Sequence, residues 1–133
     1  NKVDVWSVVL RIGIKACTDN FATGGIAALV DHRGVVCQPA IIKHPSGERF
    51  HIHPVSGEKI TGCIIPYYDQ AIALAKQAAM RIPKVRSIGW DVAITETGPY
   101  MLEGNDNWCM TLVARRRRVA AFGQFGLQYV FCL

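Results

Sequence analysis

Most of the chain has the pattern of short β-strands separated by turns. Runs rich in hydrophobic, β-branched and aromatic residues cover positions 3–14, 26–31, 34–43, 85–95 and 99–105. The short polar segments His32-Arg33 and Glu96-Thr97-Gly98 each join two of these runs, and both are typical of hairpin turns. The pattern therefore predicts two antiparallel hairpins.

A helical period is present between residues 68 and 82, and Pro83 ends it. The apolar positions that share one side of this helix are Ile72, Ala75, Ala79 and Ile82. Residues 45–62 are polar and contain several Gly and Pro residues, which indicates a connecting segment. Many strands with few helices predict an α+β fold, in which an antiparallel-rich sheet has its helices on one face.

The hairpin at residues 85–105 carries acidic and amide side chains among apolar ones. Alternate residues of a strand share a face, so we expect Glu103 and Asn105 to point the same way, together with Met101. If the hairpin pairs through its turn, Asp91 comes alongside that face. Two carboxylates and an amide oxygen form a site that suits Mg²⁺. Solvated acidic residues are the plainer alternative, but the apolar neighbours indicate strands that are buried on one face.

Three motifs occur in order along residues 8–108. The first is Asp19-Asn20-Phe21 running into Gly24-Gly25, and the second is His53-Pro54 with Gly57, Gly62 and Pro66-Tyr67. The third runs from Ser87 to Asn105 and includes Gly98-Pro99 and Leu102-Glu103-Gly104-Asn105. Together they resemble the ATP-grasp superfamily, most closely its sugar-transfer-associated branch. The resemblance implies that this chain has the fold of the carboxyl-terminal lobe of an ATP-grasp domain.

The resemblance also implies an ATP- and Mg²⁺-dependent ligase. ATP-grasp enzymes convert a carboxylate into an acyl phosphate, which an amine, a thiol or a similar nucleophile then attacks, so no protein nucleophile is expected. Asp91, Glu103 and Asn105 would hold Mg²⁺, and Arg11 and Met101 would join them in binding ATP. The carboxylate and the acceptor are unidentified, and the branch name points to polysaccharide or cell-envelope glycan synthesis.

Arg11 and Asn20 are the expected catalytic residues. In related glutathione-synthetase-like ligases an arginine at the corresponding strand position reaches the γ-phosphate or the developing acyl phosphate, a role that suits the planar fork of guanidinium donors. A solvated edge-strand arginine is the alternative. Asn20 resembles an asparagine that lies beside phosphate and metal in relatives. Gly24 and Gly25, where the backbone can approach a ligand closely, are expected to contact the substrate.

His53 and Lys59 are expected to hold the acceptor substrate. His44 and His51 lie close to His53 in the sequence, and a His-x-His pair on a strand places both rings on one face, as a zinc site can require. No fourth ligand is implied, so a zinc site is the minor alternative.

We interpret residues 1–133 as a partial domain, because the chain is too short for a whole ATP-grasp enzyme, whose other lobe brings phosphate-binding lysines and a covering loop. Residues 109–133 lie past the last motif and form an atypical tail. Without the other lobe, we expect the isolated chain to be inactive and to self-associate through apolar surface and unpaired strand edges.

Positive charge suggests a second class of function. The net charge is +5, and four consecutive arginines, Arg115, Arg116, Arg117 and Arg118, would attract nucleic-acid phosphates. Aromatic residues are not interleaved with these arginines. A non-enzymatic nucleic-acid-binding module is therefore the alternative to the ligase, and nucleic acid is not the expected partner.

No segment approaches the roughly 18 apolar residues that a membrane helix needs, and no charged-then-apolar signal opens the chain. No membrane partner is expected, and a cytoplasmic location is predicted. The five cysteines are widely separated and odd in number, which predicts reduced thiols that are buried as small hydrophobic side chains.

Overall fold

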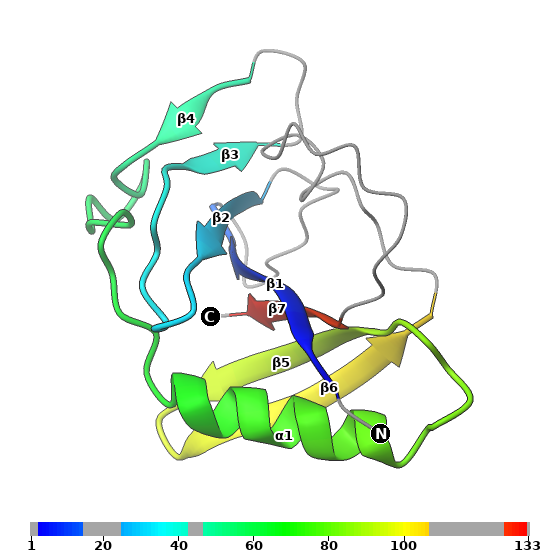
Figure 1. Ribbon diagram of the computed structural model, residues 1–133. Helices are drawn as coiled ribbons and strands as arrows, with labels where there is room; N and C mark the ends of the chain where they lie inside the picture. Colours follow the sequence, from blue (N-terminus) through cyan, green and yellow to red (C-terminus); the bar gives the residue numbers. More distant parts are fainter. Residues whose placement is uncertain (1–2, 15–24, 43–46, 107–126, 133) are drawn as a thin grey trace.

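The computed structural model describes residues 3–14, 25–42 and 47–106, together with the backbone of residues 127–132. In chain order, its elements are β1 (Val5–Ile12), β2 (Ile26–Val30), β3 (Ala40–Ile42), β4 (Arg49–Phe50), α1 (Tyr68–Met80), β5 (Gly89–Thr95), β6 (Gly98–Asn105) and β7 (Leu127–Cys132). The strands form one sheet, and α1 lies across its β5–β6 end (Figure 1). The predicted α+β fold with an antiparallel-rich sheet is confirmed.

Both predicted hairpins are present. Strand β2 pairs antiparallel with β3, and β5 pairs antiparallel with β6. In the second turn, the Thr95 hydroxyl donates to the carbonyl of Gly98 over 2.9 Å and accepts from the amide of Thr97. Gly98 has a φ of 126°, a conformation that glycine adopts without steric cost. The turn sets the pairing of β5 with β6 as far as Val92 and Met101, and beyond them the register shifts by one residue.

The sheet also contains a strand that the pattern did not predict. Strand β7 is formed by residues from the expected atypical tail and lies between β1 and β5, parallel to both, in the order β4-β3-β2-β1-β7-β5-β6 (Figure 1). In this arrangement Val9 of β1 and Asp91 of β5 are both aligned with Val130 of β7. Strand β7 thus fixes the position of the β5–β6 hairpin relative to β1.

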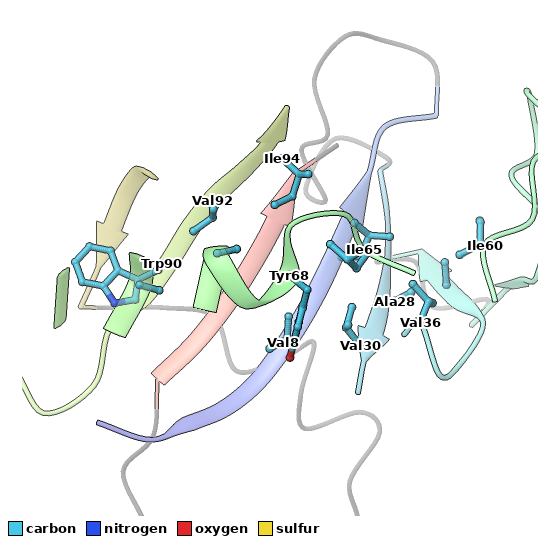
Figure 2. Close-up of a cluster of buried hydrophobic side chains, with 14 of the residues drawn as sticks. Val8, Ala28, Val30, Val36, Ile60, Ile65, Tyr68, Trp90, Val92 and Ile94 are labelled. Carbon is cyan, nitrogen blue, oxygen red and sulfur yellow. The ribbon is translucent and has the colours of Figure 1, made fainter. Parts of the chain in front are cut away.

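The hydrophobic core lies between the sheet and α1. Figure 2 shows Val8 of β1, Val30 of β2 and Tyr68 of α1 in one cluster with Val92 of β5. Burial of such side chains contributes roughly 1.5–3 kcal/mol each. The helix ends at Met80, two residues before its predicted end. The helix therefore packs against one face of the sheet, and the side chains of the alternate residues of each strand lie on the other face.

The two cysteines whose side chains are described, Cys37 and Cys63, are free thiols. Cys37 is exposed, so the prediction that it is buried is wrong. Its neighbour Val36 is the residue that enters the core, which turns the Cys37 side chain outwards. No helix in the described ranges is long and apolar enough to cross a membrane.

Candidate active site

Asp91 and Glu103 lie directly opposite each other in the β5–β6 hairpin. Opposite residues of an antiparallel pair place their side chains on the same face of the sheet, about 5 Å apart at Cβ. Asn105 follows Glu103 at the next position on that face, and its Nδ2 donates to Oε1 of Glu103 over 3.0 Å. The structure therefore brings together the three residues that the hairpin pattern singled out.

Arg11 reaches the same place from β1. Its Nη1 donates to Oδ2 of Asp91 over 3.2 Å, and the two side chains are only 20% and 16% exposed. Arg11 alternates with Val8 and Leu10 of the core and so occupies the opposite face of β1, as Asp91 does in β5. One guanidinium and two carboxylates thus meet on the face of the sheet that α1 leaves uncovered.

The group has one positively charged side chain, that of Arg11, beside the two carboxyl groups of Asp91 and Glu103. Burial is the main reason that the pKa of Asp91 is raised above its ordinary value; the Arg11 guanidinium opposes the rise, and the nearby Glu103 carboxylate adds to it. A second cation beside Asp91 and Glu103 would favour the charged form of both carboxylates. The group therefore has the chemistry of a cation site with an arginine beside it.

These oxygen donors fit Mg²⁺ as a partial set of ligands that a nucleotide and water would complete. Within the residues that the structure describes, no three His, Cys, Asp or Glu side chains gather as metal ligands. Asp91, Glu103 and the amide oxygen of Asn105 can supply part of an octahedral shell, and phosphate oxygens and waters can supply the rest. The observation that supports this fit is the burial of Asp91, which disfavours the negative charge of its carboxylate unless a cation lies beside it.

Met101 does not share the face of Glu103 and Asn105, so that expectation is wrong. A β-bulge in the hairpin shifts the register between Asp91 and Val92, so that Met101 lies opposite Val92. Val92 is fully buried, and Met101 packs against the same core. The extra residue of the bulge reverses the alternation, which turns Met101 towards the helix side.

His53 is held by contacts within the chain. Its Nδ1 accepts from the amides of Val55 and Ser56 over 3.3 and 3.0 Å, so Nε2 carries the proton and donates to the carbonyl of Gly13 over 2.9 Å. Gly13 is two residues beyond Arg11. The ring therefore ties the segment around residues 53–56 to the end of β1.

The remaining predicted residues fall in different places. Lys59 is exposed and pairs with Ile52 in an isolated bridge, and Gly25 is buried just before β2. His51 contacts the hydroxyl of Thr61. The residues that lie outside the described ranges are Asn20, Gly24, His44, Arg115, Arg116, Arg117 and Arg118.

The contact between Trp90 and Gly104 was not expected from the sequence pattern. These residues are opposite each other, next to Asp91 and Glu103, and the indole lies against the glycine. A glycine inside a strand is a signal of close approach by another group, and this signal was present in the Glu103-Gly104-Asn105 motif.

A cavity of about 560 Å³ lies elsewhere, between the first half of β1, the end of β2 and α1. Its lining includes Trp6, Asp31, Tyr68, Asp69 and Lys76. Neither Asp91 nor the three residues gathered around it contribute to the lining. The cavity and the candidate active site are therefore separate.

Comparison with protein families matches residues 1–120 to the family described as sugar-transfer associated ATP-grasp. Searches of curated proteins and of solved structures found no match to the chain. ATP-grasp proteins are in general ligase-like enzymes that use ATP, typically with Mg²⁺. The family match covers β1, β5 and β6, the strands that supply the side chains of the group around Asp91, and it ends before β7. The chain belongs to the sugar-transfer associated ATP-grasp family.

Proposed function

We propose that this chain is the carboxyl-terminal lobe of an ATP-grasp ligase that activates a carboxylate as an acyl phosphate and transfers the acyl group to an amine, a thiol or a similar nucleophile. The observation that carries the proposal is the convergence of Asp91, Glu103, Asn105 and Arg11 on one face of the sheet. The strands come from distant parts of the chain, and they place complementary charges together on the face opposite the helix.

Each residue has a role that follows from its contacts. Asp91 and Glu103 would hold Mg²⁺, which neutralises charge on the phosphates of ATP. Asn105 keeps the Glu103 carboxylate oriented through the hydrogen bond from its Nδ2 and offers its own carbonyl oxygen to the cation. Arg11, which is paired with Asp91, would direct its guanidinium towards a phosphoryl oxygen.

The chemistry then depends on positioning and charge rather than on a protein nucleophile. The acceptor oxygen of the carboxylate attacks the terminal phosphorus of ATP, and ADP leaves. Arg11 would stabilise the negative charge that spreads over the transferring phosphoryl group. The nucleophile then attacks the acyl carbon, and phosphate leaves.

The family description, which associates these proteins with sugar transfer, supports a substrate in polysaccharide or cell-envelope glycan synthesis. The acceptor would be an amino or hydroxyl group on a sugar or on a sugar-linked amino acid. His53 is less suited to binding this acceptor than the sequence suggested, because both of its ring nitrogens already have partners in the chain.

The test is Glu103→Gln in the intact protein. This change keeps the volume of the side chain and weakens a ligand, so the melting temperature should be nearly unchanged while ATP-dependent product formation falls by about 10- to 100-fold or more. Glu96→Gln is the matched control, because Glu96 is exposed at the turn of the same hairpin. Normal turnover by Glu103→Gln at limiting Mg²⁺ would refute the proposed function.

A further inference from the structure

Trp90 and Gly104 form a close pair behind the two carboxylates. They are opposite each other in the β5–β6 hairpin, where Trp90 immediately precedes Asp91 and Gly104 separates Glu103 from Asn105. Because neighbouring residues of a strand point to opposite faces, Trp90 lies on the helix side, while the carboxylates lie on the other side. The pair therefore lies directly beneath the candidate cation site.

The indole occupies the space that a side chain at position 104 would need. A Cβ atom there would overlap Cζ3 of Trp90, and it would lie 2.8 Å from Cε3 and 3.1 Å from Cη2. Trp90 is only 6% exposed and belongs to the core cluster (Figure 2). A ring packed in a dense core has little freedom to move aside.

Strand β6 is the more easily displaced partner. In the sheet that the structure describes, β6 is the last strand and pairs only with β5. A side chain at position 104 would therefore push the end of β6 away from β5 and from Trp90. Glu103 and Asn105, which are bonded to residue 104, would move with it away from Asp91.

We propose that Trp90 and Gly104 are positioning residues that set the separation between Asp91 and the Glu103–Asn105 pair, and so determine the size of the cation site. This inference rests on the proposed Mg²⁺ function. It adds a size criterion, because Mg²⁺ requires oxygen ligands at about 2.0–2.1 Å, whereas Ca²⁺ accepts about 2.3–2.6 Å. A hairpin whose strands can approach because no side chain at position 104 meets the indole favours the smaller ion.

The test uses Gly104→Ala, Trp90→Leu and the double variant in the intact protein. Binding of Mn²⁺ is followed by electron paramagnetic resonance, and Mg²⁺ and Ca²⁺ are then added as competitors. Gly104→Ala should weaken Mg²⁺ by about tenfold or more and Ca²⁺ by much less, since a wider site suits the larger ion. Adding Trp90→Leu, which gives the new methyl group room, should restore most of the preference for Mg²⁺.

A second readout requires no metal. Cross-strand nuclear Overhauser effects between residues 89–91 and 103–105 should weaken in Gly104→Ala and recover in the double variant. Leu102→Ala is the control, because Leu102 is 60% exposed on the same strand and its truncation should change neither readout. If Gly104→Ala fails to fold by itself, a double variant that folds and prefers Mg²⁺ supports the proposal.

The proposal is overturned if Gly104→Ala keeps the wild-type ratio of Mg²⁺ to Ca²⁺ affinity, or if the double variant recovers neither ion preference nor cross-strand contacts. Failure of the wild-type protein to bind Mn²⁺ would refute the cation site itself and with it this inference. The Overhauser effects distinguish the two failures, because they report the strand separation whether or not an ion binds.

Discussion

Arg11 of β1 and Asp91 of β5 form an ion pair across the strand between them, with 3.2 Å from Nη1 to Oδ2. That intervening strand is β7, in which Val130 is aligned with Asp91 and Cys132 is aligned with Arg11. The guanidinium therefore reaches diagonally across one strand. Strand β7 comes last in the sequence of the described sheet, and it separates Arg11 from Asp91. The geometry of the site therefore depends on the assembly of β1, β7 and β5 together.

Arg11→Ala should destabilise the protein by about 1–3 kcal/mol, because it leaves the half-buried Asp91 carboxylate beside Glu103 without its cation. Saturating Mg²⁺ should recover part of this loss by supplying another positive charge. Urea unfolding with and without Mg²⁺ measures both effects. Arg33→Ala is the control, since Arg33 is 72% exposed in its pair with Asp31 and such pairs contribute about 0–1 kcal/mol. Equal losses in the two variants, both insensitive to Mg²⁺, would contradict the prediction.

Asp31 should make the protein less stable in acid. The amides of Val35 and Arg33 donate to its carboxylate over 2.9 Å, and these bonds hold its pKa below the ordinary value. A carboxyl with a lowered pKa in the folded state stabilises the fold above its unfolded pKa, near 4, and this stabilisation is lost as the pH falls through the folded pKa. Asp31→Asn should therefore flatten the decline in unfolding free energy below about pH 4. Urea titrations between pH 7 and pH 3 check this, and an unchanged slope would contradict it.

The sequence predicts the local parts of this fold well. The Glu96-Thr97-Gly98 segment correctly indicates that β5 pairs with β6, because a hairpin is a local structure. The turn itself contains only Glu96 and Thr97, since Gly98 already pairs with Thr95. Strand β7 could not be predicted in the same way. Strand β7 pairs with residues of β1 that lie more than a hundred positions earlier in the chain. A short apolar segment carries no information about such distant neighbours.

The candidate site illustrates the same limit at the scale of single residues. The spacing from Asp91 to Glu103 and Asn105 predicts that these side chains meet, and the structure brings them together. The bulge that turns Met101 away adds one residue to β6, and strict alternation cannot anticipate it. Likewise, Arg11 could be assigned to a face of its strand, but its contact with Asp91 depends on the insertion of β7.

Gly34→Ala should destabilise the protein by about 2–4 kcal/mol. Gly34 has a φ of 81°, and a Cβ atom there would lie 2.6 Å from Cγ of Tyr68, so backbone strain and overlap with the core both oppose the change. Gly57→Ala separates the two causes, because Gly57 has a φ of 75° but no atom lies near its Cβ position. It should cost only about 1 kcal/mol. Thermal unfolding of the two variants gives the comparison, and equal losses would show that the Tyr68 contact is unimportant.

His53 offers a way to separate the two groups of contacts that its ring makes. In His53→Asn, the short side-chain carbonyl can still accept from the amides two and three residues ahead, as Nδ1 does, but it cannot reach the carbonyl of Gly13. His53→Ala removes both groups of contacts. We expect the unfolding free energy to fall by about 1 kcal/mol in His53→Asn and by more in His53→Ala.

The consequence for activity comes from the bond to Gly13, which lies two residues beyond Arg11 on the same segment. Both His53 variants should therefore raise the KM for ATP to a similar extent, because both free the end of β1 that carries Arg11. His51→Asn is the control, since His51 contacts Thr61 within its own segment and not β1. If His53→Asn keeps the wild-type KM while His53→Ala raises it, the turn at residues 53–56 matters for ATP and the tie to β1 does not. A large loss of kcat, with KM for ATP unchanged, would instead favour direct contact between His53 and the acceptor substrate.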